Sequence, residues 1–94
     1  MRKSLVLVLD PISDLTTYAQ LAEEAGFEAV WLTDFNNRDA FVRMAMVGQA
    51  TRKIGIASGI AYAFARSPVL TAAAAADVDE VTGGRLILGL GTGT

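Results

Sequence analysis

The strongest constraint on the fold is a regular alternation of strand-like and helical segments with almost no linker between them. Four aliphatic runs lie at residues 5–9, 29–33, 54–58 and 85–90. The residues between these runs carry apolar side chains at helical spacing, over 14–25, 39–50 and 68–81. Strands joined by single helices run parallel, because each crossover returns the chain to the same end of the sheet. The sequence therefore predicts an α/β fold, β-α-β-α-β-α-β, as a single domain over residues 1–94.

Turn and capping residues indicate where these segments end. Ser13 is the expected N-cap of the first helix, and Gly26 is expected to end that helix in the left-handed conformation. Ser67 and Pro68 form an N-cap and first-turn pair for the third helix, after a longer loop at residues 59–66.

The size of the unit limits the architecture. Both the open doubly wound sheet and the (βα)8 barrel repeat it, but a barrel needs about 250 residues. The chain has 94 residues, so we expect the amino-terminal half of a barrel, and its end on a strand indicates an excised piece. The runs at 5–9 and 86–90 read as strands buried on both faces and carry little charge to protect an edge. We therefore expect a homo-oligomer, dimeric or even-numbered, that completes the barrel. A flavodoxin-like open sheet would instead predict a monomer.

Composition excludes several classes of chemistry. The chain has no Cys and no His, so it has no disulfide, no thiolate nucleophile and no imidazole ligand, and no metal site is expected. Eight basic against ten acidic residues give a net charge of −2, without the basic excess of nucleic-acid-binding proteins. No run is long enough for a signal peptide or a membrane span, so we expect a cytoplasmic protein. Proton transfer near neutral pH would need either a carboxylate with a perturbed pKa or chemistry carried by a cofactor.

Ligands of parallel α/β folds gather at the carboxyl ends of the strands. The candidate rim residues there are Asp10, Asp34, Ser58, Gly59, Gly91 and Thr92. Each aspartate either faces a ligand or caps a loop or helix start, and Gly59 marks either a bulge or an ordinary turn. Asp10, Gly91 and Thr92 are assigned to the substrate side of this rim.

Three further features have structural interpretations. The glycines at 89, 91 and 93 lack the spacing of a dinucleotide-binding fingerprint, since Thr94 stands where a glycine is required. They are expected to let the backbone approach a ligand closely. Trp31 lies in mid-strand and is expected in the core or between the sheet and helix layers. Arg85 is expected to form an ion pair with Asp79 or Glu80.

Several segments together resemble a known family, the luciferase-like flavin monooxygenases and deazaflavin-dependent oxidoreductases. The branch most similar is that of the methylenetetrahydromethanopterin reductases. The segments that carry the resemblance are AEEAGFEAVWLTD at 22–34, NNRD at 36–39, GI at 59–60, RSP at 66–68, DEVTGGR at 79–85 and LGLG at 88–91.

The resemblance implies a (βα)8 barrel in which deazaflavin (coenzyme F420) or FMN lies across the strand-end rim. It implies that Asp34 and Phe35 approach the ring of this cofactor. It also places a bulge, sometimes with a non-prolyl cis peptide, against the ring at Ser58, Gly59 and Ile60. Hydride would then pass between the cofactor and a small organic substrate, but the resemblance identifies no catalytic residue.

The sequence departs from the family at positions that matter for activity. Phe35 stands where a His or similar polar residue is common, and Thr94 stands where an acidic residue often follows the glycines. The family's grip on the cofactor phosphate lies in the second half of the barrel. We therefore expect weak cofactor binding and no turnover from these residues alone. The alternative is a self-associating folding module without activity, a natural, reconstructed or designed half-barrel fragment.

Overall fold

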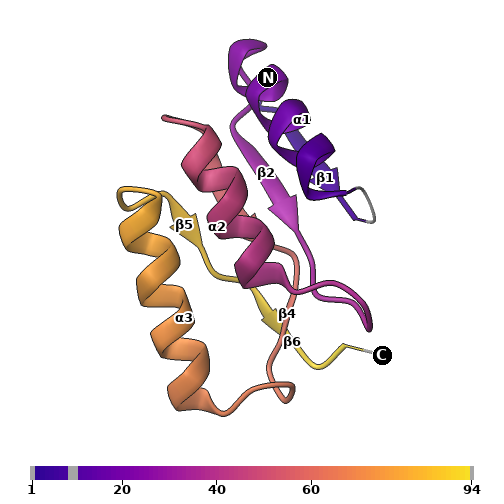
Figure 1. The fold of residues 1–94 in the computed structure, drawn as a ribbon, viewed down its shortest axis with the longest axis vertical. Coiled ribbons are helices and arrows are strands. Elements are labelled where there is room, and N and C mark those ends of the chain that lie inside the picture. Colours follow the sequence, from indigo (N-terminus) through magenta and orange to yellow (C-terminus); the bar gives the residue numbers. More distant parts are fainter. Residues whose placement is uncertain (1, 9–10, 94) are drawn as a thin grey trace.

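The computed structural model describes residues 2–8 and 11–93, and three helices lie on one side of its parallel strands (Figure 1). The main sheet has the order β1 (Ser4–Leu7), β2 (Ala29–Leu32), β3 (Gly55–Ser58) and β5 (Leu86–Ile87). The helices are α1 (Ile12–Glu24), α2 (Ala40–Ala50) and α3 (Pro68–Val81). A second parallel sheet joins β4 (Ala61–Tyr62) to β6 (Leu90–Gly91). The predicted α/β alternation with parallel strands is confirmed.

The fourth predicted strand, residues 85–90, is divided between the two sheets, and the predicted loop at 59–66 contains β4. Ala57 pairs with Ile87, whereas Ala61, four residues later, pairs with Leu90, only three residues after Ile87. One extra residue on the β3–β4 side therefore forms a bulge between the two sheets, which breaks the strand pairing there. This bulge contains Gly59. The interpretation of Gly59 as the mark of a bulge, and not of an ordinary turn, is therefore confirmed.

The helix ends follow local chemistry. Asp39 and Ser67 cap α2 and α3 by accepting hydrogen bonds from backbone N–H groups three residues ahead, as the sequence predicts for Ser67. Gly26, with a φ of 82°, follows α1 as predicted. Ser13 is not the cap of α1: the cap is Pro11, whose carbonyl accepts the first two helical hydrogen bonds at 3.0 Å each. The fixed φ of proline prepares this start without a side-chain hydrogen bond.

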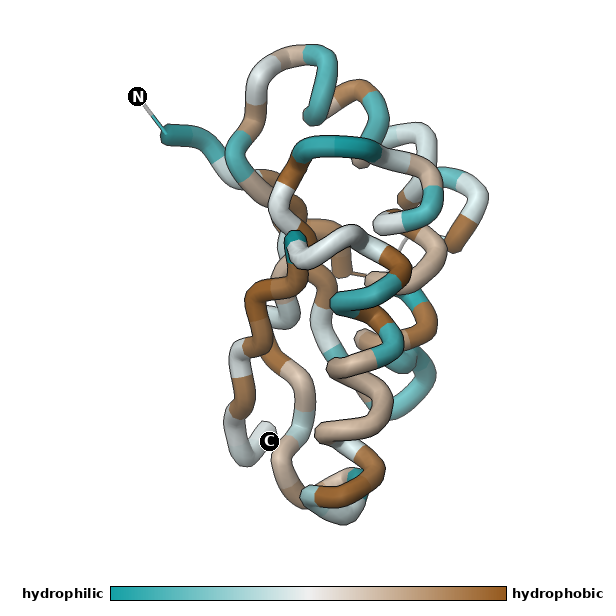
Figure 2. The backbone as a smooth tube through the Cα atoms, turned by 90° about the vertical axis from the view of Figure 1, so that its left-hand side faces the viewer, coloured by the Kyte–Doolittle hydropathy of each residue, from teal (hydrophilic) through white to brown (hydrophobic). Residues whose placement is uncertain are grey.

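The core lies between the sheet and the helices. Val30, Leu32 and Ile56 point from the central strands into this core, where they meet Leu15 and Met44 of the helices. Figure 2 shows the helices together on one side and the strands, with many hydrophobic residues, on the other.

Among the described residues, the opposite face of the sheet is covered less than the face against the helices. Val6, in the same cross-strand row as Trp31 and Ile87, is 60% exposed. The expectation that the first run is buried on both faces is therefore wrong for β1. The prediction that Trp31 lies in the core or between the sheet and helix layers is also wrong. The alternation of side chains along β2 turns Trp31 to this opposite face, where its ring lies against Gly59. This sheet face is apolar.

The amino-terminal end of the sheet is held by two charged side chains. Glu23 accepts hydrogen bonds from the backbone N–H groups of residues 52–54, at 2.6 to 3.0 Å. Arg85 donates to the carbonyl oxygens of Gly48, Thr51, Ile54 and Thr82 and to the Thr51 hydroxyl. The predicted ion pair of Arg85 with Asp79 or Glu80 does not form among the described residues. The guanidinium instead turns inward and donates to these carbonyl and hydroxyl oxygens.

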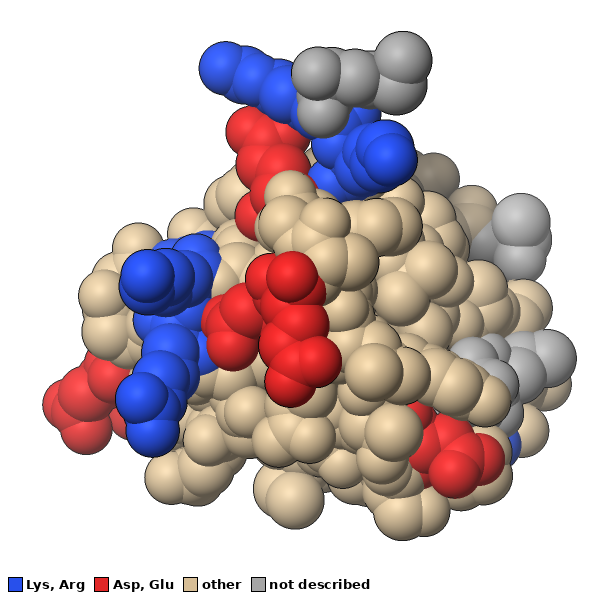
Figure 3. Space-filling view, turned by 90° about the horizontal axis from the view of Figure 1, so that it is seen from above, with Lys and Arg blue, Asp and Glu red and all other residues tan. Residues whose placement is uncertain are grey.

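The surface at this end mixes both signs of charge. Figure 3 looks onto it and shows acidic side chains beside basic ones over the strand starts. An exposed example is the pair formed by Arg2 and Glu28, at 3.6 Å. Within residues 2–8 and 11–93, each helix is too short or too polar to cross a membrane.

Candidate functional site

The carboxyl ends of β2 and β3 bring two of the predicted site segments into direct contact. The Asp34 N–H donates to the Ile60 carbonyl at 2.8 Å, and the Gly59 N–H donates to the Leu32 carbonyl at 2.7 Å. The Gly59–Ile60 peptide bond is cis. The prediction that Asp34 lies beside Gly59 and Ile60 on one rim is confirmed, since parallel strands end at the same edge of the sheet.

The carboxylate of Asp34 is buried, with 4% of the residue exposed, and both its oxygens are occupied. Oδ1 accepts from the Ala40 N–H at 2.7 Å and from Arg66 at 2.9 Å. Oδ2 accepts from the Tyr62 N–H and from Arg66, at 2.8 Å each. A carboxylate has about four acceptor positions, so the geometry commits all of them to the protein. Asp34 thereby joins the start of α2 to β4.

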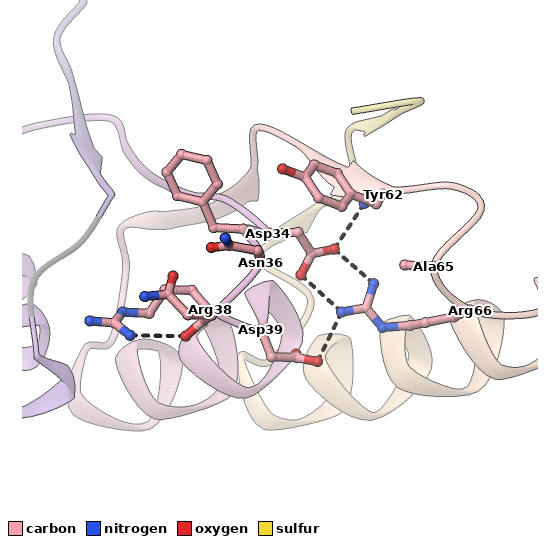
Figure 4. Close-up of a pocket in the computed structure, with 9 residues that line it drawn as sticks. Asp34, Asn36, Arg38, Asp39, Tyr62, Ala65 and Arg66 are labelled. Carbon is pink, nitrogen blue, oxygen red and sulfur yellow. Dashed lines mark hydrogen bonds and ion pairs between the residues drawn. The ribbon is translucent and has the colours of Figure 1, made fainter. Parts of the chain in front are cut away.

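Arg66 connects the two loops of the rim. Its guanidinium binds Asp34 through both terminal nitrogens and reaches Asp39 at 2.9 Å. Figure 4 shows it pointing between these two carboxylates. Its central carbon also lies 4.6 Å from the centre of the Phe41 ring, which favours a cation there. The Arg66 side chain is 17% exposed, so its charge is balanced locally rather than by solvent.

The electrostatics follow from this pairing. Burial raises the pKa of the Asp34 carboxyl group, but hydrogen bonds from Arg66, Ala40 and Tyr62 lower it further than burial raises it. The net pKa of Asp34 therefore lies below its usual range, and the carboxyl group is ionised at neutral pH. The hydrogen bond to Asp34 raises the pKa of Arg66, although burial opposes this effect.

An open cavity of about 480 Å³ lies over this network. Its lining combines two aromatic side chains, Phe35 and Tyr62, with a polar loop at residues 36–39 and with Asp34, Ala65 and Arg66 (Figure 4). Phe35 is 43% exposed. A volume of a few hundred Å³ with aromatic walls and a few polar groups is typical of small-molecule sites. Among the described residues, no cluster of three carboxylates forms a metal site there.

The other predicted site residues lie around this rim in different ways. Ser58 is fully buried, and its hydroxyl exchanges hydrogen bonds with the backbone of Gly89 at 2.8 Å. Gly91 lies against the Ile60 side chain, and Thr92 is exposed beyond it. Asp10 lies outside the described residues. The structure tests none of the predicted ligand contacts of these residues.

Gly89, which follows β5, allows another segment of the chain to pack closely against it. A Cβ on Gly89 would clash with the Ser58 carbonyl oxygen, so this position requires glycine for the close approach of β3. The sequence predicts that these glycines let the backbone approach a ligand closely. At Gly89 the group that approaches closely is instead the protein's own backbone.

Sequence reasoning missed the partners that hold the rim together, Thr33, Tyr62 and Arg66. Thr33 Oγ1 accepts from the Ile60 N–H at 3.1 Å and lies 3.2 Å from the Ile60 carbonyl. The sequence marks Arg66 only as the lone cation of a loop that starts at the same rim as Asp34, and this does not identify its partner. Tyr62 contributes its backbone to Asp34, which side-chain identity does not reveal.

The sequence matches one protein family over almost its whole length. The family model of the luciferase-like monooxygenases matches residues 2–94. The chain is 39% identical over 85 residues to the 5,10-methylenetetrahydromethanopterin reductase of Methanolobus tindarius, a match that covers 89% of this chain and 26% of that relative. The chain thus spans about a quarter of the length of the curated relatives it matches.

Solved structures agree on the fold. The coenzyme F420-dependent tetrahydromethanopterin reductase of Methanopyrus kandleri superposes with a TM-score of 0.92 at 30% identity, over 99% of this chain and 27% of that one. The oxygenating constituent of 3,6-diketocamphane monooxygenase from Pseudomonas putida, solved with FMN, gives a TM-score of 0.89 at 16% identity, over 100% and 30% of the two chains. The second likeness concerns the fold alone. The prediction that the chain forms part of a (βα)8 barrel is confirmed by the first.

Proposed function

Because the chain belongs to the luciferase-like monooxygenase family, we propose that its strand-end rim is one wall of a binding site for a flavin-type cofactor. Coenzyme F420 is favoured over FMN, since the reductase of known structure at 30% identity is described as F420-dependent. The proposed reaction of the longer enzyme is hydride transfer between this cofactor and a small organic substrate. The observation that carries the proposal is the bulge at Gly59 and Ile60 beside Asp34, next to a cavity with aromatic walls.

The residues at the rim fit a flat aromatic ring. Phe35 and Tyr62 offer aromatic surface in the cavity, and Ile60 adds a partly exposed aliphatic side chain. When bound, the cofactor supplies the redox chemistry for which this chain has no His or Cys. Phe35 and Ile60 would pack against the ring, while Asp34 and Ser58, whose polar atoms bind protein groups, would hold the backbone of the rim. Gly91 and Thr92 would border the substrate.

Fluorescence titration of the 94-residue chain with coenzyme F420 and with FMN tests this proposal. We expect saturable binding at micromolar concentration, tighter for coenzyme F420, and no measurable turnover. Phe35→Ala should weaken binding roughly threefold to tenfold, since an aromatic contact contributes about 0.5–1.5 kcal/mol. Phe64→Ala is the matched control, because Phe64 is 83% exposed and lines a different groove. Absence of saturable binding by either cofactor would overturn the proposal.

A second candidate function, self-association, is favoured by the uncovered sheet face. Val6 and Ile87 on this face are 60% and 48% exposed, and the edges of β1 and β5 pair with no described strand on their outer sides. Both edges belong to one parallel sheet, so β5 of one copy can continue in parallel into β1 of another. We propose a homo-oligomer of even number that is closed through these edges.

Sedimentation at micromolar concentration tests the assembly. We expect a dimer or a larger even-numbered assembly, and Val6→Lys should dissociate it, because the change places a charge in the buried contact. Val42→Lys is the matched control: this valine is also exposed, but it lies on the helix side. A stable monomer of the unaltered chain would contradict the proposal.

A further inference from the structure

Two consecutive residues, Thr33 and Asp34, bind the segment from Gly59 to Tyr62 on one side, while Gly89 and β6 bind it on the other. The Thr33 hydroxyl accepts from the Ile60 N–H, and the Asp34 N–H donates to the Ile60 carbonyl. The Asp34 carboxylate then accepts from the Tyr62 N–H at 2.8 Å. Both polar groups of the Ile60 backbone and the Tyr62 N–H are therefore bound by the two residues that follow β2, so the segment does not depend on a ligand for its conformation.

Asp34 performs this task only while its charge is balanced. Its carboxylate is 4% exposed, and an uncompensated charge at such a position is strongly unfavourable. Arg66 supplies the balance through two parallel hydrogen bonds of 2.8 and 2.9 Å. Without the guanidinium, the carboxylate would turn toward water and release the N–H groups of Ala40 and Tyr62. The position of the Gly59–Tyr62 segment thus depends on Arg66, whose side chain hydrogen-bonds to Asp34 and Asp39 and not to the segment itself.

We propose that Arg66 is a positioning residue for the cofactor: through Asp34 it holds the Gly59–Tyr62 segment in the single conformation that the ring requires. This inference rests on the proposed function. In this role Arg66 acts through the carboxylates and not by binding the cofactor: three of its five N–H groups bind Asp34 and Asp39, and these contacts fix the direction of the guanidinium. If loss of Arg66 leaves the segment in this conformation a tenth of the time, the affinity falls tenfold, since only the competent fraction binds.

The alternative role for Arg66 is direct attraction of an anionic part of the cofactor, and substitutions separate the two. Lysine keeps the charge but does not make the bidentate contact. A positioning role therefore predicts that Arg66→Lys weakens binding nearly as much as Arg66→Gln, whereas direct attraction predicts that Arg66→Lys binds like the unaltered chain. Positioning also predicts that Asp34→Asn weakens binding, and that Asp34→Asn with Arg66→Gln is no worse than either change alone.

The experiment measures cofactor affinity and amide hydrogen exchange on the same variants. In Arg66→Lys and Arg66→Gln we expect roughly tenfold weaker binding and at least tenfold faster exchange of the Tyr62 amide, with the Ile56 amide in the core of the sheet unchanged. Arg52→Gln, at the far end of the sheet, is the control for loss of a positive charge. Binding by Arg66→Lys equal to that of the unaltered chain, or an unchanged Tyr62 amide, would overturn the inference.

Thr33 gives a second test if the Arg66 variants do not fold. Thr33→Val removes the hydroxyl that accepts from Ile60 and should weaken binding and speed exchange of the Ile60 amide, whereas Thr33→Ser should retain both properties. Equal binding by Thr33→Val and Thr33→Ser would overturn the holding role of this network. If the unaltered chain binds neither cofactor, the proposed function fails and the affinity claim falls with it. Exchange of the Tyr62 amide then decides separately whether Arg66 holds the segment.

Discussion

The two ends of the sheet each hold an arginine in a loop network, but they give it different partners. At the carboxyl-terminal end, Arg66 faces two carboxylates, Asp34 and Asp39. At the amino-terminal end, Arg85 donates to backbone carbonyls and one hydroxyl. The carboxylate nearby, Glu23, likewise binds backbone N–H groups instead of a cation.

This difference shows what each network is suited to do. Charges that bind backbone groups fix the backbone around them, here residues 48–54 and Thr82, and leave no buried opposite charge behind when they are removed. Charges that bind each other couple two loops distant in sequence, and each then depends on the other remaining in place. Only the second arrangement lies beside the cavity with aromatic walls. The carboxyl-terminal end is therefore the more sensitive of the two to loss of one partner.

The largest expected effect comes from breaking the charge pair at the carboxyl-terminal end. Arg66→Met keeps an unbranched side chain that can pack on Phe41 but removes the cation that balances the buried Asp34 carboxylate. Removing one partner of a buried pair costs about 3–5 kcal/mol, and we expect a loss of this size in the free energy of unfolding. Urea denaturation measures it. Arg52→Met, at an exposed position, should change stability by less than about 0.5 kcal/mol. Equal effects of the two changes would contradict the comparison.

The corresponding change at the amino-terminal end should cost less. Arg85→Met removes donors to four carbonyl oxygens but strands no charge, and water can replace part of what is lost. We expect a loss of about 1–3 kcal/mol, the usual cost of leaving buried polar groups without partners. The same urea measurement applies. A loss that equals or exceeds that of Arg66→Met would show that the charge pair is not what distinguishes the two ends.

Acidification probes both ends through their carboxylates. Burial raises the pKa of Glu23 and of Asp34, but hydrogen bonds lower each one further, so both lie below their ordinary values of 4.5 and 3.8. A pKa lowered by folding stabilises the folded state above the unfolded-state pKa, and this contribution disappears as the pH falls through the folded-state pKa. Stability should therefore decline with falling pH, first below about pH 4.5 for Glu23 and then below about pH 3.8 for Asp34.

Unfolding free energies measured from pH 7 to pH 3 separate the two contributions. Glu23→Gln should flatten the decline in its upper part, and Asp34→Asn in its lower part, because each removes one titrating group. Identical profiles for the unaltered chain and both variants would show that neither carboxylate couples its ionisation to folding.

The sequence predicts the fold and the location of the rim because these depend on local patterns. Alternation of apolar runs sets the parallel strands, and Gly59 directly after one such run indicates the bulge. The direction of Trp31 was not predictable in the same way, since the alternation of a strand defines two faces without saying which one the helices cover. The division of the fourth strand also escaped prediction, because it follows from the register shift that the bulge imposes on the neighbouring strand.

The roles of the two arginines were out of reach for a different reason. Arginine side chains are long, and their partners depend on which loops the fold brings within their reach. Arg85 lies near Asp79 and Glu80 in sequence but turns to carbonyl groups that the fold leaves open. Arg66 meets Asp34 from 32 positions away. Pairing at this range is decided by the packed structure, and sequence spacing carries no information on it.

The smallest expected effect concerns an ion pair of the same chemistry as Arg66 and Asp34, but in water. Arg2 and Glu28 lie 3.6 Å apart at the amino-terminal end, with 88% and 51% of their side chains exposed. Exposed pairs of this kind contribute about 0–1 kcal/mol, because solvent screens the attraction and two mobile side chains must be ordered. Glu28→Gln should therefore lower the free energy of unfolding by less than about 0.5 kcal/mol, and 0.5 M NaCl should abolish the difference. A salt-insensitive loss of several kcal/mol would mean that burial is not what makes the pair at the carboxyl-terminal end strong.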